Sequence, residues 1–150
     1  MALRLSSGLV QGMLGTAGNN FRALMNGGWL DIFTGSQPVS ADYAETGTKL
    51  ARISSTSGTG VSDGCKFGTA ASGILPIGTP AWSGVVLVDG VAGWFRFYGS
   101  AGTSGSSNSE LRFDGSIAAV SGGDLNLKHT DLAAASTVTI TAANITQPKE

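Results

Sequence analysis

The chain has 150 residues, with nine Lys or Arg, ten Asp or Glu and a formal net charge of −1. A chain of this length folds as one ordinary domain that buries about 70% of its unfolded surface, and its single cysteine, Cys65, excludes an intrachain disulfide and a zinc site built from thiolates. The basic residues are spread singly along the sequence, which argues against nucleic acid and anionic membranes as partners, because both are bound through basic stripes or clusters.

The N-terminal segment has the apolar spacing of a short amphipathic helix over about residues 3–14. Gly15 is expected to end this helix, residues 15–20 to form a connector, and residues 21–25 to add one more helical turn. We therefore divide the chain into an N-terminal helix and connector (1–20) and a β-sandwich domain (21–150).

After Asn26-Gly27-Gly28 the pattern changes to short apolar runs separated by Gly, Asp-Gly, Ser-Gly or Pro. We predict strands at 29–34, 49–54, 65–69, 83–89, 92–98, 111–113, 117–120, 124–128 and 137–145. Twenty-three glycines exclude a mainly helical fold, because each costs about 1 kcal/mol relative to alanine in a helix. The predicted fold is a single all-β domain of β-sandwich or jelly-roll type with a short N-terminal helix.

Local patterns predict two further features. Asp89-Gly90 supplies the positive φ angles of a two-residue turn, so residues 85–88 and 91–98 are expected to form a β-hairpin. The stretch 99–109 is low in complexity and has no apolar anchor, which predicts a flexible loop or one ordered only by a neighbouring molecule. Residues 54–64 are interpreted as a second loop of the same kind.

One motif raises the possibility of an enzyme. Residues 60–64 (GVSDG) match the nucleophile elbow of α/β-hydrolases around Ser62, and acidic residues followed by His129 come in the chain order of a catalytic triad. The acidic candidates are Asp89, Glu110, Asp114 and Asp124. The elbow requires a buried strand before the serine and a helix after it, and neither is predicted here, so we interpret the chain as non-enzymatic.

The other residues with side chains that could react or bind a metal are interpreted as structural. A single histidine cannot complete a transition-metal site without partners, so His129 is interpreted as an exposed structural residue. Cys65 is interpreted as a small buried apolar residue rather than a reactive thiol. Four acids stand next to Gly, where Asp suits a turn; they are Asp63, Asp89, Asp114 and Asp124. No phosphate-binding loop or calcium loop occurs, and no cofactor is predicted.

Residues 94–98 (WFRFY) form the densest aromatic cluster. In a strand, Trp94, Arg96 and Tyr98 share one face while Phe95 and Phe97 share the other. Either both faces are covered within the chain, or Trp94, Arg96 and Tyr98 face outward as an interface, since these residue types dominate binding hot spots. The predicted contact residues are Trp29, Trp82, Trp94, Arg96 and Tyr98, together with the N-terminal segment.

The composition also favours assembly. Only 13% of the residues are charged, against about a quarter in a typical free monomer, so the polar surface must come from Ser, Thr and Gly, which cost little to desolvate. The alternative is a mildly polar monomer. No run reaches the ~20 apolar residues of a membrane span, and the first ten residues lack the apolar core of a signal peptide, so we expect synthesis in the host cytoplasm.

Five segments, taken together, carry a family resemblance. They are 30–38 (LDIFTGSQP), 50–53 (LARI), 92–99 (AGWFRFYG), 113–117 (FDGSI) and 124–127 (DLNL). Their order and spacing from about residue 20 to 128 resemble a family of small proteins encoded among the virion genes of tailed bacteriophages and prophages, and the GWFRFYG stretch is the most distinctive.

The resemblance implies a virion structural component, most specifically a head decoration (cement) protein that binds the major capsid protein and bridges capsomers. Such a protein is expected to form a closed homo-oligomer, a dimer or trimer. The alternative is a tail component, either a tube or terminator subunit or a fibre or baseplate module. The third hypothesis, from a different class, is the hydrolase built on Ser62.

Overall fold

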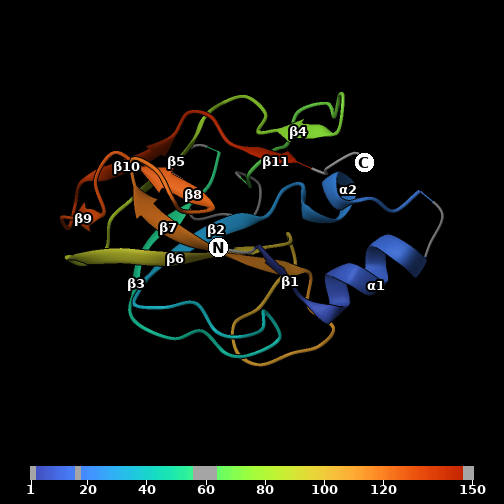
Figure 1. The fold of residues 1–150 in the computed structure, drawn as a ribbon, viewed down its shortest axis with the longest axis horizontal. Helices are drawn as coiled ribbons and strands as arrows, with labels where there is room; N and C mark the ends of the chain where they lie inside the picture. Colours follow the sequence, from blue (N-terminus) through green and yellow to red (C-terminus); the bar gives the residue numbers. More distant parts are fainter. Residues whose placement is uncertain (1–2, 16–17, 56–63, 147–150) are drawn as a thin grey trace.

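The computed structural model describes residues 3–15, 18–55 and 64–146 of the chain (Figure 1). Strands make up 42% of the structure and helices 10%, which confirms the prediction of an all-β protein with a short N-terminal helix. The elements are, in chain order, β1 (Arg4–Leu5), α1 (Ser7–Gly15), α2 (Phe21–Met25), β2 (Trp29–Thr34), β3 (Lys49–Ile53), β4 (Ile74–Pro76), β5 (Trp82–Val85), β6 (Gly90–Tyr98), β7 (Arg112–Ala119), β8 (Leu125–Leu127), β9 (Asp131–Leu132), β10 (Thr137–Ile140) and β11 (Asn144–Thr146).

The strands form one large sheet and two small ones. The large sheet has the strand order β1-β7-β6-β2-β3, with β8 added to β7 and β9 to β6, and the small sheets pair β5 with β10 and β4 with β11. In Figure 1 both small sheets lie on the same side of the large one. Isolated bridges from Ala51 to Val86 and from Ser54 to Ser83 connect β3 to β5, so the small β5–β10 sheet continues the large sheet around the core.

Alternation along the strands gives the large sheet two different faces. Leu30 and Ile32 in β2 share one face with Phe95 and Phe97 in β6, and all four are 0–4% exposed in the hydrophobic core. The ring of Phe97 lies 5.5 Å from that of Trp82 in β5, which places the core between the large sheet and the small sheets. The opposite face carries the intervening residues and is described with the candidate site.

The structure corrects the boundaries of several predicted elements. The helix begins at Ser7 rather than at residue 3, because Arg4 and Leu5 pair with Asp114 and Phe113 as strand β1. The predicted strands 111–113 and 117–120 are one strand, since Gly115 keeps pairing with β6. The predicted strand 137–145 is two strands, 65–69 holds only isolated bridges, and β4 and β9 were not predicted.

The predicted β-hairpin at Asp89-Gly90 is wrong. Strand β6 is paired with β2 and β7, while β5 is paired with β10, so the two segments do not pair with each other. Neither Asp89 nor Gly90 has a positive φ. Instead, a Cβ on Gly90 would stand 2.6 Å from the Cδ2 atom of Leu50, so the glycine allows close packing of β6 over β3.

The helices are short. Among the described residues, neither α1 nor α2 has the length and apolar character needed to span a membrane. Asn20 caps α2, since its side-chain oxygen accepts a hydrogen bond from the Ala23 backbone N–H. Helix α1 packs near β7 and α2, and it therefore belongs to the same packed unit as the sheet.

Candidate functional site

The face of the large sheet opposite the core carries a row of alternating charges across five strands. The register places Arg52 of β3 beside Asp31 of β2, Asp31 beside Arg96 of β6, Arg96 beside Asp114 of β7, and Asp114 beside Arg4 of β1. Directly opposed residues on one face of a sheet have Cβ atoms about 4.5–5.5 Å apart. Each inner charge of the row therefore has opposite charges as its cross-strand neighbours.

Two of these neighbouring pairs, Arg96–Asp114 and Arg52–Asp31, are bidentate ion pairs. The Arg96 Nε and Nη2 atoms donate to the two Asp114 carboxylate oxygens at 2.6 and 2.7 Å, and both side chains are 0% exposed. Arg52 donates to Asp31 in the same way at 2.7 Å for both bonds. Burial is the largest single effect on the pKa of Arg96 and lowers it, but the hydrogen bonds and charge of Asp114, together with the Tyr98 and Glu45 side chains, outweigh burial and hold the pKa above its ordinary value.

Glu45, in the segment between β2 and β3, covers this row of charges on the face of the large sheet opposite the core. Its Oε1 accepts hydrogen bonds from Arg96 Nη1 at 3.0 Å and from the Tyr98 hydroxyl at 2.6 Å, and its Oε2 accepts from the Gly105 N–H at 2.9 Å. Burial raises the pKa of Glu45, but these bonds and the Arg96 charge outweigh it, so the pKa lies below its ordinary value of 4.5. Burial, and then the hydrogen bond to this carboxylate, raise the pKa of Tyr98.

Arg112 organises the glycine- and serine-rich loop between β6 and β7. Its guanidinium is fully buried and donates to the carbonyl oxygens of Gly105 at 2.7 Å and Ser107 at 3.1 Å, with a longer bond to Thr103. It also donates to the Asp42 carbonyl at 3.1 Å. The prediction that this loop is flexible or ordered only by a neighbour is therefore wrong, because the chain orders the loop around its own arginine.

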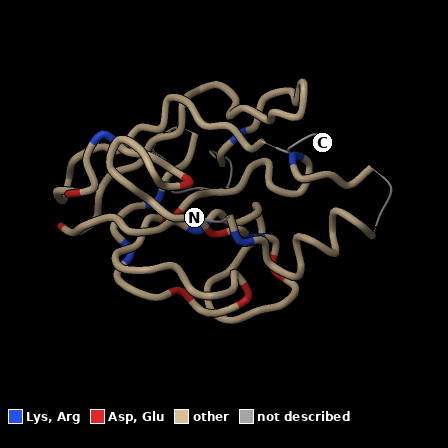
Figure 2. Tube along the Cα trace, viewed as in Figure 1, with Lys and Arg blue, Asp and Glu red and all other residues tan. Residues whose placement is uncertain are grey.

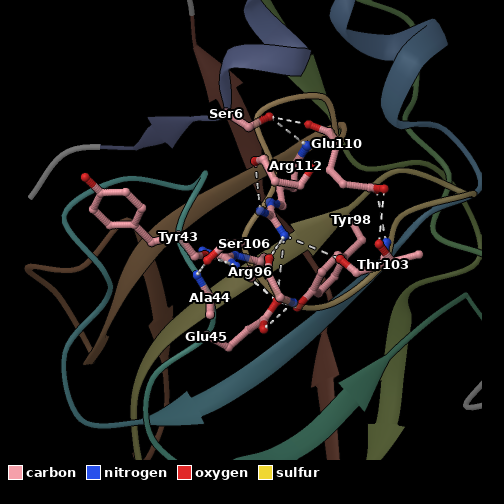
Figure 3. A network of polar contacts seen from close by, with 12 residues as sticks. Ser6, Tyr43, Ala44, Glu45, Arg96, Tyr98, Thr103, Ser106, Glu110 and Arg112 are labelled. Atoms are coloured by element: carbon pink, nitrogen blue, oxygen red, sulfur yellow. Dashed lines mark hydrogen bonds and ion pairs between the residues drawn. The ribbon is translucent and has the colours of Figure 1, made fainter.

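Two loops are joined into one surface by these contacts, and Figure 3 shows the network that holds them. We call residues 35–48 and 99–111 together the loop platform. Within it, the Ala44 N–H donates to the Ser106 hydroxyl at 3.1 Å and the Ser107 N–H donates to the Asp42 carbonyl at 2.8 Å. The sheet adds a further anchor, because the Trp94 indole N–H donates to the Thr46 carbonyl at 3.2 Å.

The most exposed side chains of the loop platform are uncharged, and its three acids are partly buried. Its most exposed large side chains are Val39, 78% exposed, and Tyr43, 56% exposed, and Tyr43 points away from the buried network in Figure 3. Each acid of the loop platform accepts a hydrogen bond within the chain. Asp42 accepts from the Ser7 N–H at 2.8 Å, Glu45 from Arg96 Nη1 at 3.0 Å, and Glu110 from the Thr103 N–H at 3.0 Å. What faces outward is a fixed surface of small hydroxyls with two larger side chains.

Four of the five predicted contact residues are buried by their own chain. Trp82, Trp94, Arg96 and Tyr98 are 0–3% exposed, so the prediction that they form an outward contact surface is wrong, and the competing interpretation of a strand covered on both faces holds. The cover on one face is the loop platform. Trp29 is partly exposed, with Arg52 over its ring at 4.8 Å, and its role in contacts stays a prediction.

The catalytic candidates that the structure describes each have a separate structural setting. Ser62 and Asp63 lie outside the described residues, and His129 is exposed, as predicted. Asp89 accepts from the Ala134 N–H at 2.7 Å and Asp124 from the Ser116 N–H at 2.8 Å. Asp114 lies inside β7 and pairs with Arg96, so its interpretation as a turn residue is wrong. Within residues 3–15, 18–55 and 64–146, no three His, Cys, Asp or Glu side chains gather as metal ligands.

Cys65 is fully buried, which confirms its interpretation as a small core residue. Burial raises the pKa of its thiol to about 12, and the thiolate is the reactive form. We therefore expect the native protein to resist a disulfide reagent such as dithionitrobenzoate at neutral to mildly alkaline pH and to react with one equivalent once urea unfolds it. Rapid labelling of the folded protein would contradict this placement.

Sequence reasoning missed Asp31, Asp42, Glu45, Arg52 and Arg112. Lys and Arg occur as isolated positions along the trace rather than as a stripe (Figure 2), and only the strand register brings the charges of the row together.

Comparison of the chain with protein-family models, with curated proteins and with solved structures finds no match.

Proposed function

We propose that this protein is a non-catalytic structural component of a tailed-phage virion that docks onto other protein subunits through the loop platform. Its most specific form is a capsid decoration protein bound to the major capsid protein. The observation that carries the proposal is that charged side chains order the loop platform. Arg96, Arg112 and Glu45 hold its two loops by hydrogen bonds, although the loops have few apolar anchors of their own. Fixing loops in advance removes the ordering cost of binding.

The chemistry of the loop platform fits a protein partner. Ser, Thr and Gly at its surface cost little to desolvate, and the engaged acids leave no buried charge that a partner would have to neutralise. Tyr43 provides a rigid aromatic side chain of the kind that dominates contact energies. The loop platform has no Lys or Arg of its own, which also disfavours nucleic acid, because nucleic acid is bound through Lys and Arg.

Decoration would act by thermodynamic linkage. A protein that binds the assembled shell, and not its dissociated subunits, shifts the assembly equilibrium toward the shell. A contact that is weak for one copy gains strength when linked copies touch neighbouring capsomers, because the later contacts are effectively intramolecular. The location that follows from the proposal is the virion, after synthesis in the host cytoplasm.

Replacing Tyr43 by Ala should weaken binding to heads by about thirtyfold, the effect of removing a central aromatic contact. The measurement is co-sedimentation of purified protein with undecorated heads of the phage that encodes it, over a range of protein concentrations. Ile74→Ala removes a 40% exposed apolar side chain outside the loop platform and serves as the control that should bind like wild type.

Failure of the wild-type protein to co-sediment with heads would refute decoration. Binding to tails but not to heads would assign the chain to the tail instead. Equal binding of the Tyr43→Ala and wild-type proteins to heads would leave decoration standing but would remove the loop platform as the contact surface.

A further inference from the structure

A cavity of about 450 Å³ lies between the large sheet and the small sheets. Buried aromatic side chains form its inner wall: Phe67, Trp82, Phe95, Phe97 and Phe113. Protein interiors seldom hold voids larger than a water molecule, and an apolar cavity of about 150 Å³ takes up one benzene molecule. This cavity therefore has room for two or three apolar side chains.

The cavity opens to the surface between two segments of the chain. Asp124 and Asn126 line its mouth at β8, and Ala142, Asn144 and Thr146 line it on the side of β10 and β11; all five are exposed. An apolar interior with a few polar groups at the entrance is the usual composition of a binding pocket. The mouth is therefore accessible to another molecule.

The strands that border the mouth each have an unpaired edge. Among the described residues, β8 pairs only with β7, β10 only with β5 and β11 only with β4. An edge strand presents backbone N–H and C=O groups to which a further strand can bind, and Lys, Pro or a β-bulge normally protects it. Residues 132–146 contain no charged residue and no Pro, and β10 pairs with β5 without a register shift. The edge of β10 is therefore open to a further strand.

We propose that the cavity and the edge of β10 receive an extended segment of a different protein, which adds to β10 as a strand and places apolar side chains in the cavity. Every second side chain of a strand points to the same face, so three apolar residues at alternating positions match the volume of the cavity while the backbone pairs with β10. This is recognition by strand addition. A small apolar molecule would fill the cavity but leave the strand edge unpaired.

The charge at the mouth defines one further property of the incoming segment. None of the described Lys or Arg residues lines the cavity, and the described residues give Asp124 no ion pair. The Asp124 Oδ2 atom accepts hydrogen bonds from the Ser116 N–H at 2.8 Å and hydroxyl at 2.7 Å, which holds the carboxylate in place. This carboxylate attracts a cation and repels an anion. The segment that fits is uncharged apart from one Lys or Arg that reaches Asp124.

The cavity and the loop platform lie on opposite faces of the large sheet. Phe95 and Phe97 of β6 line the cavity, whereas Arg96 and Tyr98 of the same strand contact Glu45 of the loop platform. Both surfaces can be occupied at once, so one chain can contact two different subunits. The inference goes beyond docking through the loop platform and does not depend on it.

The test is a titration of dye-labelled peptides with the purified full chain up to about 1 mM, followed by fluorescence anisotropy. Four peptides of about seven residues, enough for one strand, begin with Lys and then alternate Thr with Val, Ile, Leu or Phe. We expect at least one to bind with a Kd below about 100 µM. N-methylation of one of its two alternate sets of backbone amides, or Ser in place of its apolar residues, should weaken binding by about tenfold or more.

Variants of the chain locate the binding site. Ala142→Trp places a large ring at the mouth from an exposed position and should weaken peptide binding by about tenfold or more. Ala133→Trp changes an exposed alanine of the same segment that does not line the cavity, so it is the matched control and should bind like wild type. Asp124→Asn should weaken binding by about threefold, and only for peptides that carry the Lys. Urea unfolding of each variant checks that the fold is unchanged.

Absence of binding by all four peptides, or equal binding to the wild type and to Ala142→Trp, would overturn the inference. Equal binding of the peptide and of both N-methylated forms would also overturn it, because the cavity would then accept small apolar groups without strand pairing. Heads are absent from this titration. Peptide binding without head binding therefore refutes only the docking function, and head binding without peptide binding refutes only this inference.

Discussion

Asp114→Ala should lower the free energy of unfolding by about 3–5 kcal/mol, the cost of leaving one partner of a buried ion pair alone. Arg96 would keep its charge in a fully buried position and would lose two hydrogen bonds of 2.6 and 2.7 Å. The loss is a large fraction of the 5–15 kcal/mol that stabilises a typical domain. It should also loosen the loop platform, because Arg96 donates to the Tyr43 carbonyl and to Glu45.

Equilibrium urea unfolding of the wild type and variants measures this loss. Asp131→Ala removes an exposed aspartate of β9 and should change stability by no more than about 0.5 kcal/mol. Asp114→Asn keeps the size and one acceptor oxygen, so it should fall between the two and remain folded if the alanine variant does not. A double variant, Arg96→Met with Asp114→Leu, should recover much of the loss, since well-packed apolar residues can replace a buried pair. Equal stability of Asp114→Ala and Asp131→Ala would show that the pair contributes nothing.

The strands were predictable where local pattern and packing agree. Residues 29–34 are a short run rich in apolar and aromatic side chains, and the structure has β2 over the same residues with Leu30 and Ile32 in the core. Alternation in residues 94–98 correctly separated Phe95 and Phe97 from the other face. The all-β class follows from many such short runs, because each run fixes its own strand without knowledge of its partners.

The row of alternating charges could not be predicted from local sequence patterns, because it depends on pairing between distant strands. Asp31, Arg96 and Asp114 become neighbours only through the register of β2, β6 and β7. In the sequence Asp114 stands before Gly115, which locally favours a turn. In the fold, a Cβ at position 115 would stand 2.5 Å from a ring carbon of Phe95, so the glycine makes room for an aromatic side chain inside a continuous strand.

The order of the loop 99–109 could not be predicted from its local sequence either. Its own sequence has no apolar anchor, and the prediction of flexibility followed from that. The anchors lie outside it: Arg112 is on strand β7, and Glu45 is on a loop 60 residues from its partner Gly105. Arg112 stands between Leu111 and Phe113 in a predicted strand, and an arginine flanked by apolar residues directly after a glycine-rich loop is the sequence signal that would have indicated an ordered loop.

Glu45→Gln should lower the free energy of unfolding at pH 7 by about 1.5–3 kcal/mol, the contribution of hydrogen bonds to a charged group. The glutamine keeps the size of the side chain, but it removes the charge that accepts from Arg96, Tyr98 and Gly105. Amide hydrogen exchange at Gly105 should become faster, because its N–H loses a charged acceptor that holds the two loops together.

The effect of Glu45→Gln should also depend on pH in a defined direction. The pKa of Glu45 in the folded protein lies below its ordinary value of 4.5, so its carboxylate contributes stability that is fully present above that value and is lost as the pH falls through the folded pKa. Urea unfolding from pH 7 down to about pH 3 should therefore show the wild type losing its advantage over the variant as acid is added. Glu110→Gln, a change of the same kind in the loop platform at a more exposed hydrogen bond, should cost no more than about 1 kcal/mol. An advantage of the wild type over Glu45→Gln that stays constant down to pH 3 would mean that the ionised carboxylate does not hold the loop platform on the sheet.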